Sequence, residues 1–442
     1  MAQIAPFAAL HFDPSRVQLD QVIAPPYDVI SPAQQEALYR LHPENIVRLI
    51  LNKETIADTD ADNRYTRAAI YLNEAMAQKI IIQDSGPALY EYIQIFEHPL
   101  DPRHLVERRT LFVALKLEPY EKGIVLPHEE THPKAKADRL LLMRATHSNA
   151  EPIYGLYADP QQTVAQRLEQ SRGNSAPLLK ATFPGKTGAA TEQHLLYRHT
   201  DSSLLQEIKA FFAPQRVWIA DGHHRYETAL NYQKEHETME FSPSDYILIG
   251  LSAFEDPGMV VLPTHRLVKN LTPARLEDLA LQLQRFFHVH ILPLPEARAW
   301  IRVQTAEEKR FLIVLPGKAY ALTLRDMVQA QEAMEQAGAA HSPAWRQLDV
   351  TLLQTLVLDR SLGIGWQALA HTPDVGYTRD EEEAVLKVQS GEYQLACLLQ
   401  NPTVTEVRDV AADGDKMPQK STFFYPKLYS GLVIRSLEGS SP

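Results

Sequence analysis

An acid, a glycine, two histidines and an arginine follow one another in the segment VWIADGHHRYETAL, residues 217–230. The run RVWIA has the apolar composition of a buried strand. The run RYETALNYQKEH has the apolar spacing of an amphipathic helix. Residues 221–224 are therefore predicted to form the corner between a strand and a helix.

This corner has the chemistry of an anion site. The first N–H groups of a helix lack intrahelical acceptors and lie at the positive end of its dipole. Gly222 permits a positive φ or a close approach of the backbone. His223, His224 and Arg225 add hydrogen-bond donors. Asp221 fits there if it caps the helix or binds a divalent metal such as Mg²⁺. The alternative is a capped helix with two solvated histidines, although capping requires only the acid.

A second group of titratable residues lies in HEETHPKAKADR, residues 128–139. His128 and His132 match the H-E-x-x-H zinc motif, and Glu151 follows as a potential third ligand. Zinc binding requires both histidines on one face of a continuing helix, and Pro133 disfavours helical dihedrals at the residue before it. We therefore expect no structural zinc, and a zinc-dependent hydrolase remains the less favoured alternative.

The same segment supplies groups that bind and activate a substrate. Glu129 or Glu130 can take the proton of an alcohol. Lys134 and Arg139 can bind the carboxylate of a small substrate. We therefore predict a site loop in which Glu129 is the base; the alternative is a polar loop without a role.

Further polar residues are weaker candidates for substrate binding. Asp28 follows the extended corner Pro-Pro in APPYDV, and Arg266 emerges from an expected strand in LPTHRLV. The aromatic run of KSTFFYPKL has the default structure of a buried strand and is surrounded by Lys420, Ser421, Thr422 and Lys427. These lysines and hydroxyls can also reach a phosphate or a carboxylate.

The composition limits the classes of partner. The chain has 442 residues, of which 45% are hydrophobic and 22% charged, as in an ordinary globular protein. The net charge of -11 argues against a broad nucleic-acid surface. The single cysteine, Cys397, excludes an intramolecular disulfide. No signal peptide or membrane-spanning run is recognised, so we expect a cytoplasmic protein without a membrane partner.

Strand patterns mixed with helices favour the α+β class, with largely antiparallel sheets. Residues 87–97 and 108–118 have strand composition and flank a turn that contains Asp-Pro, which predicts an antiparallel pair. Residues 246–254 and 259–268 flank the turn EDPG, which predicts a second hairpin.

The pattern changes to helix, strand, helix and two strands between residues 270 and 340. This stretch is predicted to be an inserted α/β lobe, residues 270–340. Residues 1–269 and 341–442 then form a composite domain that carries the site. Within it, the segment from 342 to 363 has the apolar spacing of a helix.

Long segments of the chain also match a known family in order. They are APPYDV, HEETHPKAKADR, SNAEPIYGLY, IADGHHRYETA, DPGMVVLPTHRLV and MPQKSTFFYPKL. On these segments the chain resembles the prokaryotic domain-of-unknown-function family 1015 over nearly its whole length. Membership of this family implies no particular reaction.

The corner itself resembles the motif of free serine kinases built on the ParB/sulfiredoxin-like fold. In that superfamily the corner after the strand binds nucleotide phosphates, and in the kinases an acid elsewhere activates the substrate hydroxyl. The resemblance implies a ParB/sulfiredoxin-like core and phosphate contacts from residues 222–225, to which we add Thr228 on the next turn. Asp221 would orient the phosphates or bind Mg²⁺.

The expected function is a phosphotransferase that uses ATP or ADP with Mg²⁺ and a small hydroxylated metabolite, with L-serine as the first candidate. Phosphoryl transfer requires phosphate donors, charge neutralisation and a group that orients the nucleophile. The alternative is a ParB-like nucleotide-switched binding or regulatory protein. The acidic net charge argues against DNA as its partner.

Overall fold

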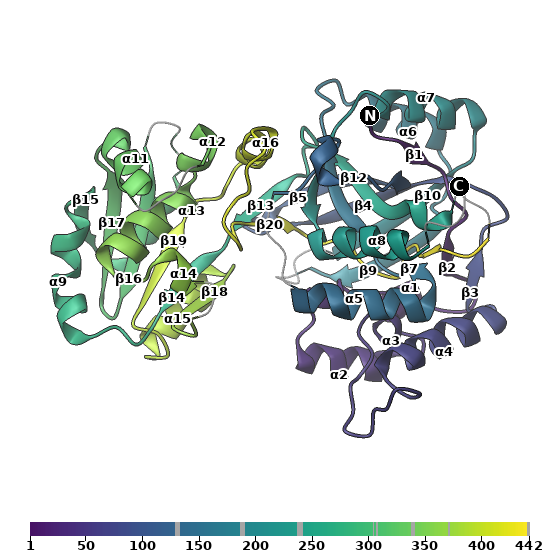
Figure 1. Ribbon diagram of the computed structural model, residues 1–442, viewed down its shortest axis with the longest axis horizontal. Helices are drawn as coiled ribbons and strands as arrows, with labels where there is room; N and C mark the ends of the chain where they lie inside the picture. Colours follow the sequence, from purple (N-terminus) through teal and green to yellow (C-terminus); the bar gives the residue numbers. More distant parts are fainter. Residues whose placement is uncertain are drawn as a thin grey trace. The chain divides into compact units, whose positions relative to one another are not determined.

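The chain divides into two compact units in the computed structural model. The first unit comprises Met1–Val260 and Pro426–Pro442, and the second comprises Val261–Tyr425. Both are drawn in Figure 1. The structure describes residues 1–128, 133–185, 191–236, 242–303, 305, 308–336, 341–369 and 372–439.

The first unit is built on a nine-stranded sheet. Two short antiparallel pairs, β2 with β3 and β7 with β21, lie outside it. The strands of this unit are β1 (Ile4–Ala5), β2 (Leu10–Phe12), β3 (Ile81–Gln83), β4 (Leu89–His98), β5 (Asp101–Lys116), β6 (Val125–Leu126), β7 (Ser148–Asn149), β8 (Ile153–Tyr157), β9 (Leu179–Pro184), β10 (Thr191–His199), β11 (Val217–Asp221), β12 (Tyr246–Ala253) and β21 (Arg435–Ser436).

The order of the large sheet is β6-β11-β8-β12-β5-β4-β10-β9, with β1 also paired to β5. The pairs β6 with β11 and β8 with β12 are parallel, and the other pairs are antiparallel. The sheet is therefore mixed and largely antiparallel, which confirms the predicted α+β class.

Helices surround this sheet, and α5 and α8 lie side by side (Figure 1). The helix α4 packs on the other side of α5. The helices of the first unit are α1 (Leu19–Val22), α2 (Pro32–Leu41), α3 (Val47–Ile50), α4 (Arg64–Ala77), α5 (Pro133–Thr146), α6 (Thr163–Arg172), α7 (Ser202–Phe212) and α8 (His223–Glu235), with short 3-10 turns at Tyr27–Val29, Tyr120–Lys122 and Pro243–Asp245.

One of the two predicted hairpins is confirmed. The strands β4 and β5 pair antiparallel, with Tyr92 opposite Thr110. The hairpin predicted from residues 246–254 and 259–268 is wrong. Both edges of β12 are used by β5 and β8, so no edge remains for the segment that follows the EDPG turn.

The second unit holds a six-stranded sheet and a two-stranded one formed by β13 and β20. Its strands are β13 (Val260–Pro263), β14 (His265–Val268), β15 (Phe287–Leu292), β16 (Arg310–Leu315), β17 (Lys318–Leu324), β18 (Val375–Thr378), β19 (Leu395–Leu399) and β20 (Thr422–Tyr425). Its helices are α9 (Pro273–Leu283), α10 (Leu294–Arg302), α11 (Met327–Gln336), α12 (Pro343–Arg346), α13 (Asp349–Leu352), the π-helix η4 (Leu353–Ser361), α14 (Trp366–Leu369), α15 (Glu381–Gln389) and α16 (Val404–Ala412).

The order of elements predicted for residues 270–340 occurs in the structure, as α9, β15, α10, β16 and β17. The sheet they form is larger than the predicted lobe, because its order is β15-β17-β16-β19-β14-β18. The strands β14, β18 and β19 lie outside residues 270–340. The second unit therefore extends from 261 to 425 rather than from 270 to 340.

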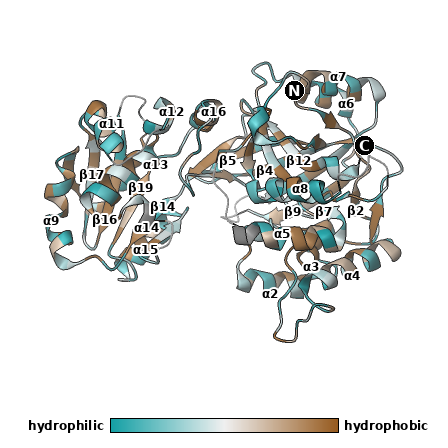
Figure 2. Ribbon diagram, viewed as in Figure 1, coloured by the Kyte–Doolittle hydropathy of each residue, from teal (hydrophilic) through white to brown (hydrophobic). Residues whose placement is uncertain are grey.

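Hydrophobic residues are frequent in the buried strands, as the brown colour of β16 shows (Figure 2). In the first unit a core joins buried side chains of β5, β12 and α8, including Leu115, Ile249 and Tyr226. In the second unit a core joins β16, β19 and α15, including Leu312, Leu398 and Val385. Among the described residues, no helix is long and apolar enough to cross a membrane.

Candidate functional site

The strand-to-helix corner has the predicted structure. The strand β11 ends at Asp221, Gly222 takes a left-handed conformation with φ of 90°, and α8 begins at His223. Apolar residues bury β11 between β6 and β8, while Tyr226, Ala229 and other inward positions bury α8. Since the first N–H groups of α8 have no intrahelical acceptor, they are available at this corner.

The carboxylate of Asp221 pairs with two cations, one from the next helical turn and one from a distant part of the sequence. Its Oδ2 accepts a hydrogen bond from Nη2 of Arg225 at 2.8 Å, one turn along α8. Its Oδ1 accepts from Nζ of Lys427 on the C-terminal segment of the first unit. Burial alone would raise the pKa of Asp221, but the charges of Lys427 and Arg225 outweigh it and lower the pKa from 3.8 to about 2. Asp221 is therefore ionised at neutral pH.

The guanidinium of Arg225 is fixed from two sides. Nη1 donates to the main-chain oxygen of Pro152, while Nη2 donates to Asp221. Arg225 is only 8% exposed, so its charge lies in a largely dry environment. A Cβ at Gly222 would lie 3.0 Å from Nε of Arg225. Glycine at 222 thus provides both the left-handed turn and the space for the arginine.

We expect Gly222→Ala to lower the free energy of unfolding by about 1–3 kcal/mol, because it adds backbone strain and displaces Arg225. Urea unfolding followed by circular dichroism measures the change. Gly173→Ala is the matched control, since Gly173 has φ of +53° with nothing within 4 Å of the added Cβ. An equal loss in both variants would mean that the contact with Arg225 contributes nothing.

Two histidines pack against each other beside the corner. The main-chain N–H of His128 donates to Nε2 of His223 at 3.1 Å, and the ring centroids are 4.7 Å apart. Nδ1 of His128 lies 2.6 Å from the main-chain oxygen of Ile219 and donates to it. Because Nε2 of His223 accepts a hydrogen bond, this ring is neutral and its proton is on Nδ1. His223 is 6% exposed. The side chain that was predicted to contact a phosphate is therefore a buried and neutral ring.

Burial lowers the pKa of His128 from 6.5 to about 4 and lowers the pKa of His223 well below 6.5, with the charge of His128 adding to the shift of His223. The unfolded chain then binds more protons than the folded chain between about pH 4 and 6.5. The contribution of these neutral rings to the free energy of unfolding is fully present above pH 6.5 and is lost as the pH falls towards 4.

We expect the free energy of unfolding to decrease between pH 6.5 and 4, with a smaller decrease in His128→Asn, whose amide can still donate to Ile219. Urea titrations at a series of pH values measure the slope. His104→Asn, which changes an exposed histidine, is the control and should leave the slope as it is. An unchanged slope in His128→Asn would contradict the role of His128.

A second buried charge cluster lies next to Arg225. Oε2 of Glu151 is 3.4 Å from Nη1 of Arg139, and Oε1 accepts from the N–H of Tyr27 at 3.0 Å and from Oγ of Ser430 at 3.1 Å. Burial raises the pKa of Glu151 in spite of the charges of Arg225 and Arg139. The charge of Glu151 in turn acts on Arg225, so the two clusters are electrostatically linked.

The sequence profile of a family described as "Protein of unknown function (DUF1015)" matches residues 4–351. The chain belongs to this family. The match contains the whole corner and the helix after it, and it confirms the resemblance that the sequence segments indicated. No curated protein sequence matches this DUF1015 chain.

Solved structures resemble the DUF1015 chain only distantly. A conserved hypothetical protein from Pyrococcus furiosus is 13% identical, with a TM-score of 0.34 over 74% of this chain and 95% of that one. A free serine kinase in complex with AMP is 12% identical, with a TM-score of 0.34 over 71% and 86%. SbnI from Staphylococcus aureus, with a C-terminal truncation, is 11% identical, with a TM-score of 0.36 over 74% and 90%. Similarities at this level do not assign a function.

The remaining candidates of the first unit have different environments in this DUF1015 chain. Asp28 is exposed, and its charge acts on Arg225. Thr228 is fully buried and donates from Oγ1 to the main-chain oxygen of Lys136 at 3.3 Å, so it ties α8 to α5. Arg139 is 7% exposed and also donates to the main-chain oxygen of Ile50. Glu129 and the side chain of Lys134 lie outside the described residues.

Three predicted substrate contacts belong to the second unit. Nζ of Lys420 lies 4.2 Å from the ring centroid of Tyr377, and the buried guanidinium of Arg266 lies 5.6 Å from it. Ser421 is buried and donates from Oγ to the main-chain oxygen of Pro418. The structure therefore brings Lys420 and Arg266 together around Tyr377.

The zinc alternative is not supported at the described positions. His128 follows β6 in irregular structure, and α5 begins at Pro133, so His128 is not on that helix. Both oxygens of Glu151 already accept hydrogen bonds from other groups. Within the described ranges no group of three or more His, Cys, Asp or Glu side chains could hold a metal ion.

Asp221 also does not fit the predicted role of an Mg²⁺ ligand. Each of its two oxygens meets a cation, and a bound metal would have to displace Lys427 or Arg225. The carboxylate fits the role of a counter-ion that positions these two side chains.

The sequence did not indicate that Lys427 lies at the corner, although its segment KSTFFYPKL was a candidate for binding a phosphate or a carboxylate. Lys420 and Lys427 occur in the same motif, and the spacing along the chain does not show that Lys427 belongs to the first unit. Glu151 was noted as a possible zinc ligand, whereas the structure pairs it with Arg139.

Proposed function

We propose that the corner binds the phosphates of a nucleotide and that the protein is a nucleotide-dependent phosphotransferase. The observation that supports this most is the pair of cations, Arg225 and Lys427, held by Asp221 at the N-terminus of α8. Helix N–H groups and fixed cations together are a typical phosphate site. The acceptor we propose is a small hydroxylated metabolite, with L-serine as the first candidate from the resemblance of the corner.

In this proposal the residues of the corner bind and orient the donor. The N–H groups of α8 and the side chains of Arg225 and Lys427 contact the phosphate oxygens, and Asp221 keeps both cations in place. Mg²⁺ enters with the nucleotide as part of the substrate and neutralises phosphate charge. Since Asp221 does not fit a metal ligand, the protein contributes its own cations and no step depends on a resident metal.

The acceptor hydroxyl is proposed to lose its proton to the carboxylate of Glu129. The hydroxyl oxygen then forms a bond to the terminal phosphorus, and the bond from that phosphorus to the bridging oxygen breaks. The bridging oxygen leaves with the electron pair, so ATP gives ADP, or ADP gives AMP. We propose Lys134 for the carboxylate of the acceptor and the exposed Asp28 for its ammonium or hydroxyl group.

Calorimetric titration with ATP and with ADP, each with Mg²⁺, tests the donor site. We expect saturable binding of at least one of them, and ³¹P NMR should then show transfer to L-serine. Binding without transfer to any hydroxylated acceptor would favour the ParB-like nucleotide switch. If neither nucleotide binds, the proposal is wrong.

A further inference from the structure

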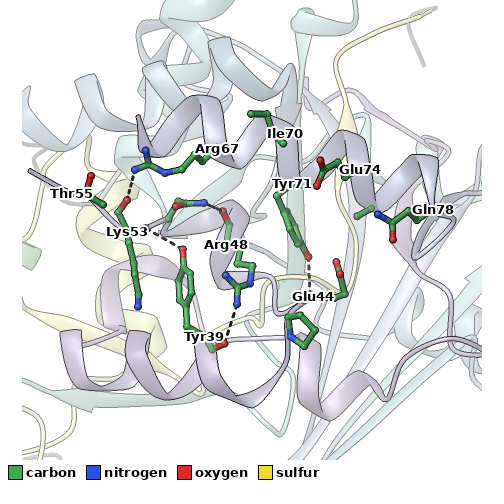
Figure 3. A pocket seen from close by; sticks show the side chains of 13 residues that line it. Tyr39, Glu44, Arg48, Lys53, Thr55, Arg67, Ile70, Tyr71, Glu74 and Gln78 are labelled. Atoms are coloured by element: carbon green, nitrogen blue, oxygen red, sulfur yellow. Dashed lines mark hydrogen bonds between the residues drawn. The ribbon is translucent and has the colours of Figure 1, made fainter. Parts of the chain in front are cut away.

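A polar pocket of about 440 Å³ lies among α2, α3, α4 and the segment after α3 (Figure 3). It is lined by residues of both charges and by two tyrosines, and it contains none of the residues of the corner. The lining residues are Tyr39, Pro43, Glu44, Arg48, Asn52, Lys53, Thr55, Arg67, Ile70, Tyr71, Glu74, Ala75 and Gln78.

Cations surround Tyr39 at one side of the pocket. The guanidinium carbon of Arg48 is 4.2 Å from the ring centroid of Tyr39, and Nζ of Lys53 is 4.5 Å from it. Burial raises the pKa of Tyr39, while the charges of Arg48, Lys53 and Arg67 act in the opposite direction. All three cations are therefore within electrostatic reach of one hydroxyl group.

Arg48 differs from the other cations in its partners. Nζ of Lys53 lies 2.5 Å from Glu36, and Arg67 has Asp58 as a partner at 2.8 Å. Within the part of the chain that the structure describes, Arg48 has no carboxylate partner. Its Nη2 donates to the main-chain oxygen of Tyr39 at 3.0 Å, and its buried Nε has no hydrogen-bond partner there. Because no described carboxylate neutralises Arg48, its charge is available to an anionic ligand in the pocket that it lines.

The other side of the pocket is acidic. Glu44 and Glu74 line it, and neither makes an ion pair among the described residues. Tyr71 donates its hydroxyl to the main-chain oxygen of Glu44 at 2.8 Å. Burial raises the pKa of Tyr71. The charge of Glu44 adds to this increase, and the charge of Arg48 opposes it. Figure 3 shows the side chain of Tyr71 extending from α4 between Arg48 and Glu74.

We propose that this pocket binds a small zwitterion. Its anionic group, a phosphate or a carboxylate, pairs with Arg48 and Lys53, and its cationic group pairs with Glu44 and Glu74. Arg48, Glu44 and Glu74 line the pocket without an ion-pair partner among the described residues, which favours a ligand that carries both charges over a ligand with either charge alone. This site is separate from the proposed nucleotide site and does not depend on it.

Phosphoethanolamine, ethyl phosphate and ethanolamine test the proposal by calorimetry with the full chain. We expect phosphoethanolamine to bind at least about tenfold more tightly than each of the other two, a difference of about 1.4 kcal/mol. β-Alanine, which carries a carboxylate in place of the phosphate, distinguishes the two anionic groups. Equal binding of all probes, or binding of none, would overturn the proposal.

Variants then assign the two sides of the pocket. Arg48→Met should weaken phosphoethanolamine at least about tenfold, while the exposed Arg40→Met on α2 is the matched control and should not change it. The double change Glu44→Gln and Glu74→Gln should remove the preference over ethyl phosphate. If Arg48→Met does not fold, Arg48→Lys and Lys53→Met take its place. Unaltered affinity in the folded variants would contradict the assignment.

Discussion

Asp221→Asn is expected to lower the free energy of unfolding by about 3–5 kcal/mol at pH 7. Removing one partner of a buried ion network leaves the charges of the others uncompensated. In this protein Arg225 and Lys427 would face each other without the carboxylate between them. Urea unfolding of the full chain measures the loss.

Two variants show whether the loss comes from buried charge. Glu207→Gln breaks an exposed ion pair with Arg167 and should cost no more than about 1 kcal/mol. Lys427→Met added to Asp221→Asn should recover part of the loss, because it removes one of the two unpaired cations. A loss in Asp221→Asn no larger than that in Glu207→Gln would contradict the network.

The network also predicts how acid acts on the wild-type chain. The pKa of Asp221 lies at about 2 in the folded chain, below its usual value of 3.8. Its contribution to stability is therefore fully present above about pH 4 and is lost as the pH falls towards 2. The Asp221→Asn variant lacks this part of the acid dependence.

Lys427→Met is expected to weaken the binding of ATP or ADP by roughly 10- to 100-fold, because it removes a charge-assisted hydrogen bond to a phosphate. The same substitution leaves Asp221 with Arg225 as a partner, so the corner should remain folded. Calorimetric titration with Mg²⁺ present measures the affinity.

Lys122→Met is the control for this variant. Lys122 is a largely exposed lysine of the same unit that pairs with Glu118, and its removal should leave the affinity within about twofold. If Lys427→Met binds nucleotide as tightly as Lys122→Met does, Lys427 does not contact the phosphates. The corner would then be a structural ion network.

The strand-to-helix corner could be predicted because all of its signals are local. Four apolar residues of β11 precede Asp221, and the apolar spacing that follows defines α8. Gly222 at the junction indicates the left-handed turn that the structure contains. The anionic character expected for a ligand also follows from this local arrangement.

The partners of the corner could not be predicted, because they depend on contacts between distant segments. Lys427 is 206 positions from Asp221, and Ser430 is 279 positions from Glu151. The periodicity of apolar residues does not indicate contacts between segments that are so far apart in the sequence. The histidines illustrate the same point, since the neutral form of His223 results from a hydrogen bond with His128 on another segment.

Sheet pairing limited the prediction of the fold in the same way. The turn EDPG is local and indicates a hairpin, but β12 pairs with β5 and β8 instead. The extent of the second unit depends on β18 and β19, which come far later in the chain than β14 but pair with it. Local patterns predict the elements, whereas the neighbours of each strand depend on the whole chain.

The place of Lys427 in the chain has a consequence for biosynthesis. The ribosome makes residues 1–260 first, then the whole second unit, and only afterwards the segment that begins at Pro426. During that interval Asp221 and Arg225 can already pair, but Lys427 and Ser430 have not yet been translated. The charge network of the corner is therefore completed only after translation of the second unit. Until then the corner of the nascent chain lacks the contacts of Lys427 and Ser430.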